Sequence, residues 1–160
     1  MKNRIDSLIS IYNTNSKLLI NSFAKVTEAD ALKRPNRRTN SMIFIVLHIL
    51  DARCFMLTQI GKQTKNPFAK YVDWAKTIDE IKVYPKLKKV LTEWKRIDKI
   101  FVGETSELKS RKLNSDQQFE FPGGKKIIEM ISFLAEHEAY HIGQISFIRK
   151  YIGYPATSYE

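Results

Sequence analysis

The sequence predicts an all-α protein whose single domain, residues 1–160, is a four-helix bundle with a long crossover between the second and third helices. Two observations support this fold class. Four stretches of the chain repeat apolar residues three and four positions apart, the spacing that gathers side chains on one helix face. Hydrophobic residues make up 43% of the chain, which is enough to form one core without disulfides.

The first helix is expected over residues 4–26, with an apolar stripe of Ile5, Leu8, Ile9, Tyr12, Leu19 and Phe23. Polar residues interrupt the middle of this stripe at Asn13, Asn15 and Ser16. They either face a functional site or mark where the helix meets solvent, and we expect the second.

The second helix is expected to begin at a cap, Asn40 or Ser41, and to continue to about Ile60, since both cap side chains can accept a backbone N–H. Its inner side should carry Phe44, Leu47, His48, Asp51, Ala52 and Phe55. Cys54 is six residues from His48 and points elsewhere, so we interpret it as a small packed side chain and not as a nucleophile.

The crossover is expected over residues 61–76, where Phe68 and Trp74 would cover one end of the core. The third helix has two possible starts. Residues 77–80 have the spacing of a capping box, which favours a start at Thr77. Pro85 then either kinks the helix or marks where its regular part begins. The apolar stripe continues to Gly103 through Leu87, Val90, Leu91, Trp94, Ile97 and Phe101.

The last helix is the longest and is expected over residues 125–152, between Gly124 and Gly153. Before it, residues 118–121 alternate polar and aromatic side chains, which permits a short strand or hairpin arm. The helix has an apolar stripe of Ile127, Met130, Ile131, Leu134, Ile145, Ile148 and Ile152. His137 and His141 interrupt the middle of this stripe, one helical turn apart.

The chain carries a net charge of +10, which would attract nucleic acid, anionic membrane surfaces and acidic small molecules. We interpret the cations of residues 82–99 as a solvated helix face, and nucleic acid as an improbable partner, because no base-reading motif is present. One cysteine, no signal-peptide core and an apolar run of only residues 42–47 predict a cytoplasmic protein without a membrane partner.

All three histidines of the chain, His48, His137 and His141, lie on apolar helical faces. Burying three imidazoles is costly unless each finds a partner, so we favour one shared divalent cation over three separate core histidines. Residues 137–141 also match the HExxH pattern of zinc proteases. That interpretation is disfavoured, because the only other histidine lies upstream and no edge strand for a substrate cleft is expected.

The motifs of both histidine helices resemble those of the DinB-like (DinB/YfiT) superfamily. The last helix shows His137-x-x-Tyr140-His141-x-Gly143-Gln144-Ile145, followed by Ile148-Arg149-Lys150 and Gly153. The second shows Thr39-Asn40-Ser41 followed by Val46-Leu47-His48-Ile49-Leu50-Asp51. The resemblance implies a four-helix bundle, a divalent metal held by His48, His137 and His141, and a homodimer. Relatives include thiol-dependent S-transferases and metal-dependent hydrolases.

Three nitrogen ligands would leave a position open on zinc or nickel, as in catalytic sites. A bound water or low-molecular-weight thiol would be deprotonated there. Gln144 is expected to orient a substrate or water. Tyr140 either donates a proton or supports His137 from behind, and Asp51 fixes the tautomer of His48. For Tyr140 and Asp51 a purely structural role is an equal alternative. Glu138 is expected to face solvent.

The sequence thus favours a metal-dependent enzyme, a thiol S-transferase or hydrolase acting on a small, anionic molecule. The alternatives are a metal-binding bundle without turnover and a basic nucleic-acid-associated protein.

Overall fold

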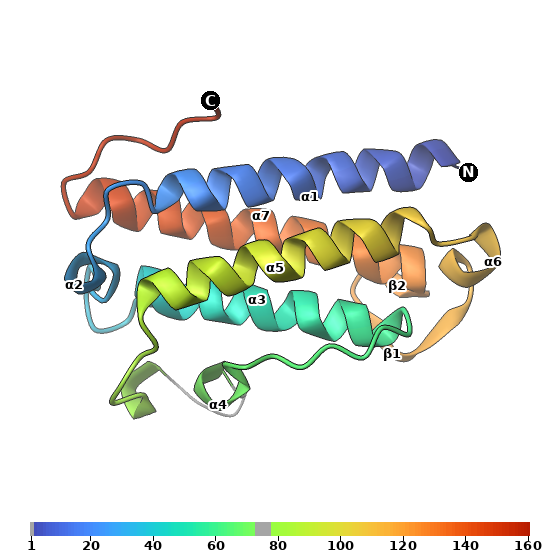
Figure 1. Ribbon diagram of the computed structural model, residues 1–160, viewed down its shortest axis with the longest axis horizontal. Coiled ribbons are helices and arrows are strands. Elements are labelled where there is room, and N and C mark those ends of the chain that lie inside the picture. Colours follow the sequence, from blue (N-terminus) through green and yellow to red (C-terminus); the bar gives the residue numbers. More distant parts are fainter. Residues whose placement is uncertain (1, 73–77) are drawn as a thin grey trace.

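The computed structural model describes the backbone of residues 2–72 and 78–160 and the side chains from residue 5 onward within those ranges. Its long helices are α1 (Lys2–Ser22), α3 (Met42–Gln59), α5 (Leu87–Ser106) and α7 (Ile127–Tyr151). These helices run alongside one another (Figure 1). Both α5 and α7 pack against α1 and α3, which places α1 diagonally across the bundle from α3. The predicted all-α four-helix bundle is confirmed.

The helix α3 is apolar around most of its circumference. The Ser41 hydroxyl accepts the N–H of Phe44, so Ser41 is the cap of this helix. Of the side expected to face inward, Leu47 is buried but the other five residues are only half-buried. The expected inner side of α3 was therefore wrong. Because α3 is apolar on several sides, the positions of its aromatic residues do not show which side faces the core. Among the described helices, α3 alone is long and apolar enough to span a membrane, and 61% of it is buried in the bundle.

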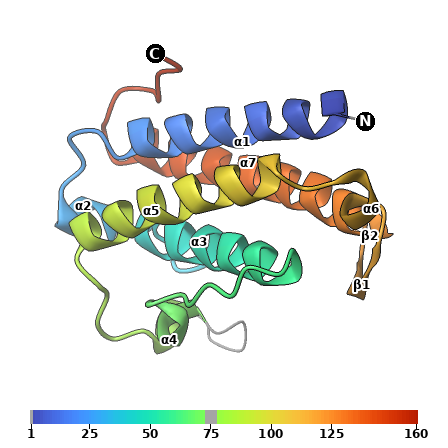
Figure 2. The same ribbon diagram turned by 45° about the vertical axis from the view of Figure 1, so that its right-hand side comes forward.

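A long crossover joins α3 to α5, as predicted, and its described residues lie outside the bundle (Figures 1 and 2). It contains α4 (Ala69–Val72) and a single 3-10 turn, η1 (Ile78–Glu80). Phe68 packs against the core. The regular third helix begins at Leu87, so the start after Pro85 is correct and the start at the capping box is wrong. Thr77 and Trp74 lie outside the described residues.

A hairpin precedes the last helix. It follows α6 (Ser110–Leu113) and consists of β1 (Asp116–Phe121) paired antiparallel with β2 (Gly124–Lys126). The predicted strand is confirmed, and β2 delays the start of α7 by two residues. Gly124 has a φ of 125°, and a Cβ there would collide with the Glu129 carboxylate. That carboxylate accepts the Lys126 N–H at 2.8 Å and so begins α7.

The polar residues in the middle of α1 are not all solvated. Asn15 and Ser16 are buried, which contradicts the expectation, whereas Asn13 is exposed. Asn15 donates to the Ala135 carbonyl at 3.2 Å, and Ser16 accepts the Trp94 indole N–H at 2.8 Å. Each buried polar group thus has a partner on a neighbouring helix. The helix ends at Ser22, earlier than expected, and α2 (Glu28–Ala31) follows.

Candidate metal centre

Three histidine side chains meet where α3 faces α7. His137 and His141 lie one turn apart on α7, and His48 reaches them from α3. The Nε2 atom of His137 is 3.3 Å from that of His48 and 3.1 Å from that of His141. One ring nitrogen from each histidine lies within 4.8 Å of the others. The fold therefore brings together the three residues that the sequence predicts as metal ligands.

These distances suit one bound cation. Tetrahedral zinc with bonds of about 2.0–2.1 Å separates its nitrogen ligands by about 3.3–3.4 Å. Each nitrogen of a neutral imidazole has either one N–H or one lone pair, so His137 Nε2 can make a good hydrogen bond to only one of the two neighbouring Nε2 atoms. His137 Nδ1 is buried and has no hydrogen-bond partner among the described residues. Three lone pairs directed at one cation would resolve the crowding of the Nε2 atoms.

Burial lowers the pKa of each of the three histidines. For His137 the pKa falls to about 4, first through burial and then through the charges of His141 and His48. Burial and His141 lower the pKa of His48, and Asp51 opposes them. Burial lowers the pKa of His141, although its hydrogen bond with Gln144 raises it. Neutral imidazoles are the form that binds metal, so the site is ready for a cation near neutral pH.

Acidification should destabilise the metal-free protein between about pH 6.5 and pH 4. His137 has a pKa of about 4 in the folded protein and the ordinary 6.5 when unfolded. The unfolded chain therefore takes up the proton first, so stability that is present above pH 6.5 is lost as the pH falls towards 4. Urea unfolding across this range, with a chelator present, measures the slope. His137→Gln should reduce the slope, and an identical slope would assign the acid sensitivity to other groups.

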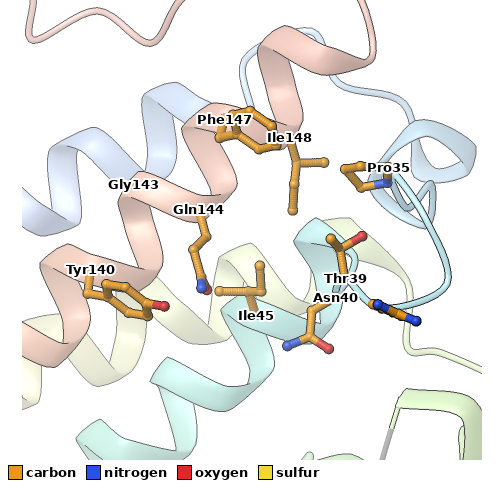
Figure 3. Close-up of a pocket in the computed structure, with 10 residues that line it drawn as sticks. Pro35, Thr39, Asn40, Ile45, Tyr140, Gly143, Gln144, Phe147 and Ile148 are labelled. Atoms are coloured by element: carbon orange, nitrogen blue, oxygen red, sulfur yellow. The ribbon is translucent and has the colours of Figure 1, made fainter.

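The two residues predicted to take part in catalysis lie beside this cluster. Gln144 Oε1 is 2.8 Å from His141 Nδ1, and the ring of Tyr140 lies 5.2 Å from that of His141 between centroids. Tyr140 is 61% exposed. Figure 3 shows both side chains extending from α7 towards α3, where they line a pocket of about 510 Å³. Gln144 thus contacts one candidate ligand, His141, directly, whereas the Tyr140 hydroxyl is available to a molecule in the pocket.

Asp51 has a different partner from the one expected. Its carboxylate accepts a hydrogen bond of 2.7 Å from Asn66 in the crossover, and it acts on His48 through its charge. The interpretation of Cys54 as a packed side chain is confirmed, because it is buried. Burial, followed by the charges of Asp51 and Glu93, raises its thiol pKa to about 12, which suppresses the nucleophilic thiolate form.

Glu138 faces the core, so the expectation that it faces solvent was wrong. It lies between the two histidines of α7 in the sequence, yet it is only 2% exposed. Arg53 of α3 donates to both of its carboxylate oxygens, at 2.7 Å from Nε and 2.9 Å from Nη2. This pairing directs the carboxylate away from the histidines. It also excludes the part of general base that the HExxH pattern would give to Glu138.

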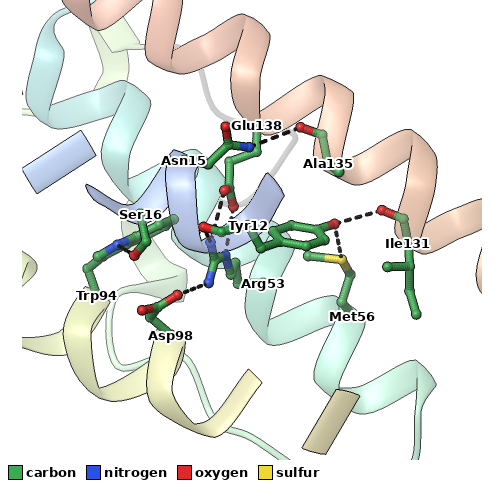
Figure 4. Close-up of polar contacts among 10 residues, drawn as sticks. All are labelled: Tyr12, Asn15, Ser16, Arg53, Met56, Trp94, Asp98, Ile131, Ala135 and Glu138. Carbon is green, nitrogen blue, oxygen red and sulfur yellow. Dashed lines mark hydrogen bonds and ion pairs between the residues drawn. The ribbon is translucent and has the colours of Figure 1, made fainter. Parts of the chain in front are cut away.

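Arg53 is fully buried and connects all four long helices (Figure 4). Besides Glu138 of α7, it pairs with Asp98 of α5 and donates to the Tyr12 carbonyl of α1 at 3.4 Å. Its guanidinium carbon lies 4.5 Å from the centroid of the Trp94 ring. Burial by itself would lower the Arg53 pKa, but the carboxylates of Glu138 and Asp98 raise it above its ordinary value. No role was expected for this arginine from the sequence, although a charge in the most apolar helix was a usable signal.

The family model of the DinB superfamily matches residues 12–145. The chain belongs to the DinB superfamily. The match includes all three histidines and Gln144, so the residues that converge in the structure lie within the region that defines membership. DinB-superfamily proteins are associated with metal ions, and here His48, His137 and His141 form a group that could hold one. No curated protein matches the chain.

Proposed function

We propose that this DinB-superfamily chain is a metal-dependent enzyme in which His48, His137 and His141 hold one divalent cation, zinc or nickel. The observation that carries the proposal is the convergence of three Nε2 atoms within bonding reach of a shared ion, next to a pocket. The carboxylates near the histidines in sequence are directed elsewhere, since Glu138 pairs with Arg53, Asp51 accepts from Asn66, and Glu136 is exposed. A ligand set of neutral imidazoles leaves the ion its full charge.

The neighbouring side chains would prepare and orient the reactants. Such a cation, when bound, lowers the pKa of a coordinated water or thiol and supplies hydroxide or thiolate near neutral pH. Gln144 accepts the proton of His141 Nδ1, which fixes the tautomer that leaves Nε2 free as a ligand. The Tyr140 hydroxyl lies on the pocket side and can donate a hydrogen bond or a proton to a bound molecule. Together these groups suit two kinds of reaction on a small anionic molecule. One is transfer of a thiol to it as an electrophile, and the other is its hydrolysis.

Turnover by the metal-loaded protein tests this proposal. We expect zinc- or nickel-loaded protein to conjugate a low-molecular-weight thiol, such as cysteine or bacillithiol, to 1-chloro-2,4-dinitrobenzene, or to hydrolyse 4-nitrophenyl esters. A chelator should abolish the activity, and re-added metal should restore it. Metal binding without turnover of any of these probes would instead support a metal-binding bundle that lacks enzymatic activity.

A further inference from the structure

The pocket beside the histidines is formed by two parts of the chain that are distant in sequence. The loop before α3 supplies Arg38 and Asn40. The helix α7 supplies Tyr140, Gln144 and Phe147 (Figure 3). Its volume of about 510 Å³ falls within the range of about 300–1,000 Å³ that is usual for small-molecule sites. One wall is made by the residue that contacts His141, so a molecule in the pocket lies next to the candidate metal centre.

The polar groups that line the pocket are suited to an anion. Arg38 is the only charged residue among the described residues that line it, and its guanidinium offers a planar set of N–H donors. The Gln144 oxygen is occupied by His141, which leaves its NH₂ group free to donate. Asn40 and Tyr140 add an amide and a hydroxyl. A single guanidinium beside neutral donors matches a carboxylate, which carries one charge, better than a doubly charged phosphate.

Apart from Thr39, whose hydroxyl donates to the Asn36 carbonyl at 2.9 Å, and Gly143, the remaining lining is apolar. In Figure 3, Ile148 lies between Phe147 and Pro35, and Ile45 of α3 lies beside the end of the Gln144 side chain. Phe147 is 61% exposed, so a ligand that covered its ring would bury apolar surface that the fold leaves in water. The pocket therefore combines one cationic group with an aromatic and aliphatic wall. This combination suits an organic acid with a hydrophobic body.

We propose that this pocket binds small carboxylates with an apolar body, with Arg38 holding the carboxylate and Phe147 covering the body. That such acids are substrates rests on the proposed function, whereas their binding depends only on the pocket. In the bound molecule, the part beside Gln144 is the part presented to the metal centre. Arg38 is then a specificity-determining residue for the proposed reaction.

Binding of 3-phenylpropionate to the metal-free protein tests the pocket without interference from a cation. Titration followed by NMR should shift signals of Gln144 and Ile45, and the neutral amide 3-phenylpropionamide should bind at least about tenfold more weakly, as expected when a charge-assisted hydrogen bond is lost. Arg38→Gln should weaken carboxylate binding by a similar factor, and Arg38→Lys should weaken it less. Arg37→Gln is the matched control, because Arg37 is the adjacent exposed arginine and does not line the pocket.

Three results would overturn the pocket assignment: equal affinity for acid and amide, equal effects of Arg38→Gln and Arg37→Gln, or shifted signals that map elsewhere. The metal content of the same variants separates this proposal from the proposed function. If carboxylate binding does not depend on Arg38 but the protein shows metal-dependent turnover, the pocket assignment is refuted and the proposed function stands. If carboxylate binding depends on Arg38 but the protein takes up no metal, the proposed metal-dependent function is refuted and the pocket assignment stands.

Discussion

Replacing Arg53 by methionine should lower the free energy of unfolding by about 3–5 kcal/mol, the usual effect of removing one partner of a buried ion pair. The methionine keeps much of the apolar contact with the Tyr12 and Trp94 rings, but it leaves the carboxylate of Glu138 buried without its two N–H donors. Asp98 also loses Arg53 as its partner, but its side chain is 24% exposed, so water can solvate it more readily than it can Glu138. Urea or thermal unfolding of the metal-free protein measures the loss.

Arg96→Met is the matched control for this variant. Arg96 lies on α5 and pairs with Glu93 at 2.6 Å, but its side chain is 50% exposed, so its ion pair should contribute about 0–1 kcal/mol. Combining Arg53→Met with Glu138→Gln should recover part of the lost stability, because the second change removes the unpaired buried charge. If Arg53→Met were no more destabilising than Arg96→Met, the buried pair would not hold α3 against α7.

Replacing any one of the three histidines by alanine should abolish tight binding of zinc or nickel. Each of His48, His137 and His141 would supply one of three nitrogen ligands, and two nitrogens alone make a much weaker site. Equilibrium dialysis with elemental analysis measures the bound metal. In the wild type, metal at 100 times its dissociation constant should stabilise the fold by about 2.7 kcal/mol, and this increment should vanish in each variant.

Glu136→Gln is the control for the histidine variants, because Glu136 precedes His137 on α7 but is exposed. It should retain the metal. Circular dichroism should show that chelated wild type and all variants remain helical, since the bundle has its own apolar core. Full metal occupancy in His48→Ala would contradict a three-ligand site. Loss of helix upon chelation would show instead that the metal is structural.

The periodicity of apolar residues predicted α1, α5 and α7 because each of these helices is buried on one side and solvated on the other. It was least informative for α3, where apolar residues surround the axis and no single face stands out. The start of the third helix was misplaced by the capping-box spacing of residues 77–80, whereas α5 begins at Leu87, two residues after Pro85. The homodimer and the cytoplasmic location remain predictions.

The three histidines were found from sequence because all of them lie on apolar helical faces, where three buried imidazoles together need partners. Two other features of the site were not found from the sequence. The partnership of Arg53 and Glu138 spans 85 residues, and spacing within one helix does not show which charged side chain turns inward to meet another. The pocket depends on the loop at Arg38 folding back against α7, and a connection of this kind has no periodicity from which its path could be predicted.

The distribution of the histidines between two helices has a consequence for the order of folding. His137 and His141 approach each other as soon as α7 winds, whereas His48 lies 89 residues from His137 and joins them only after α3 docks on α7. An ion held by all three in a disordered chain would close a long loop at a considerable entropic cost. Tight capture should therefore come late, after the nonlocal helix pair has assembled. The rate of metal uptake during refolding would then time the docking of α3 on α7, separately from helix formation.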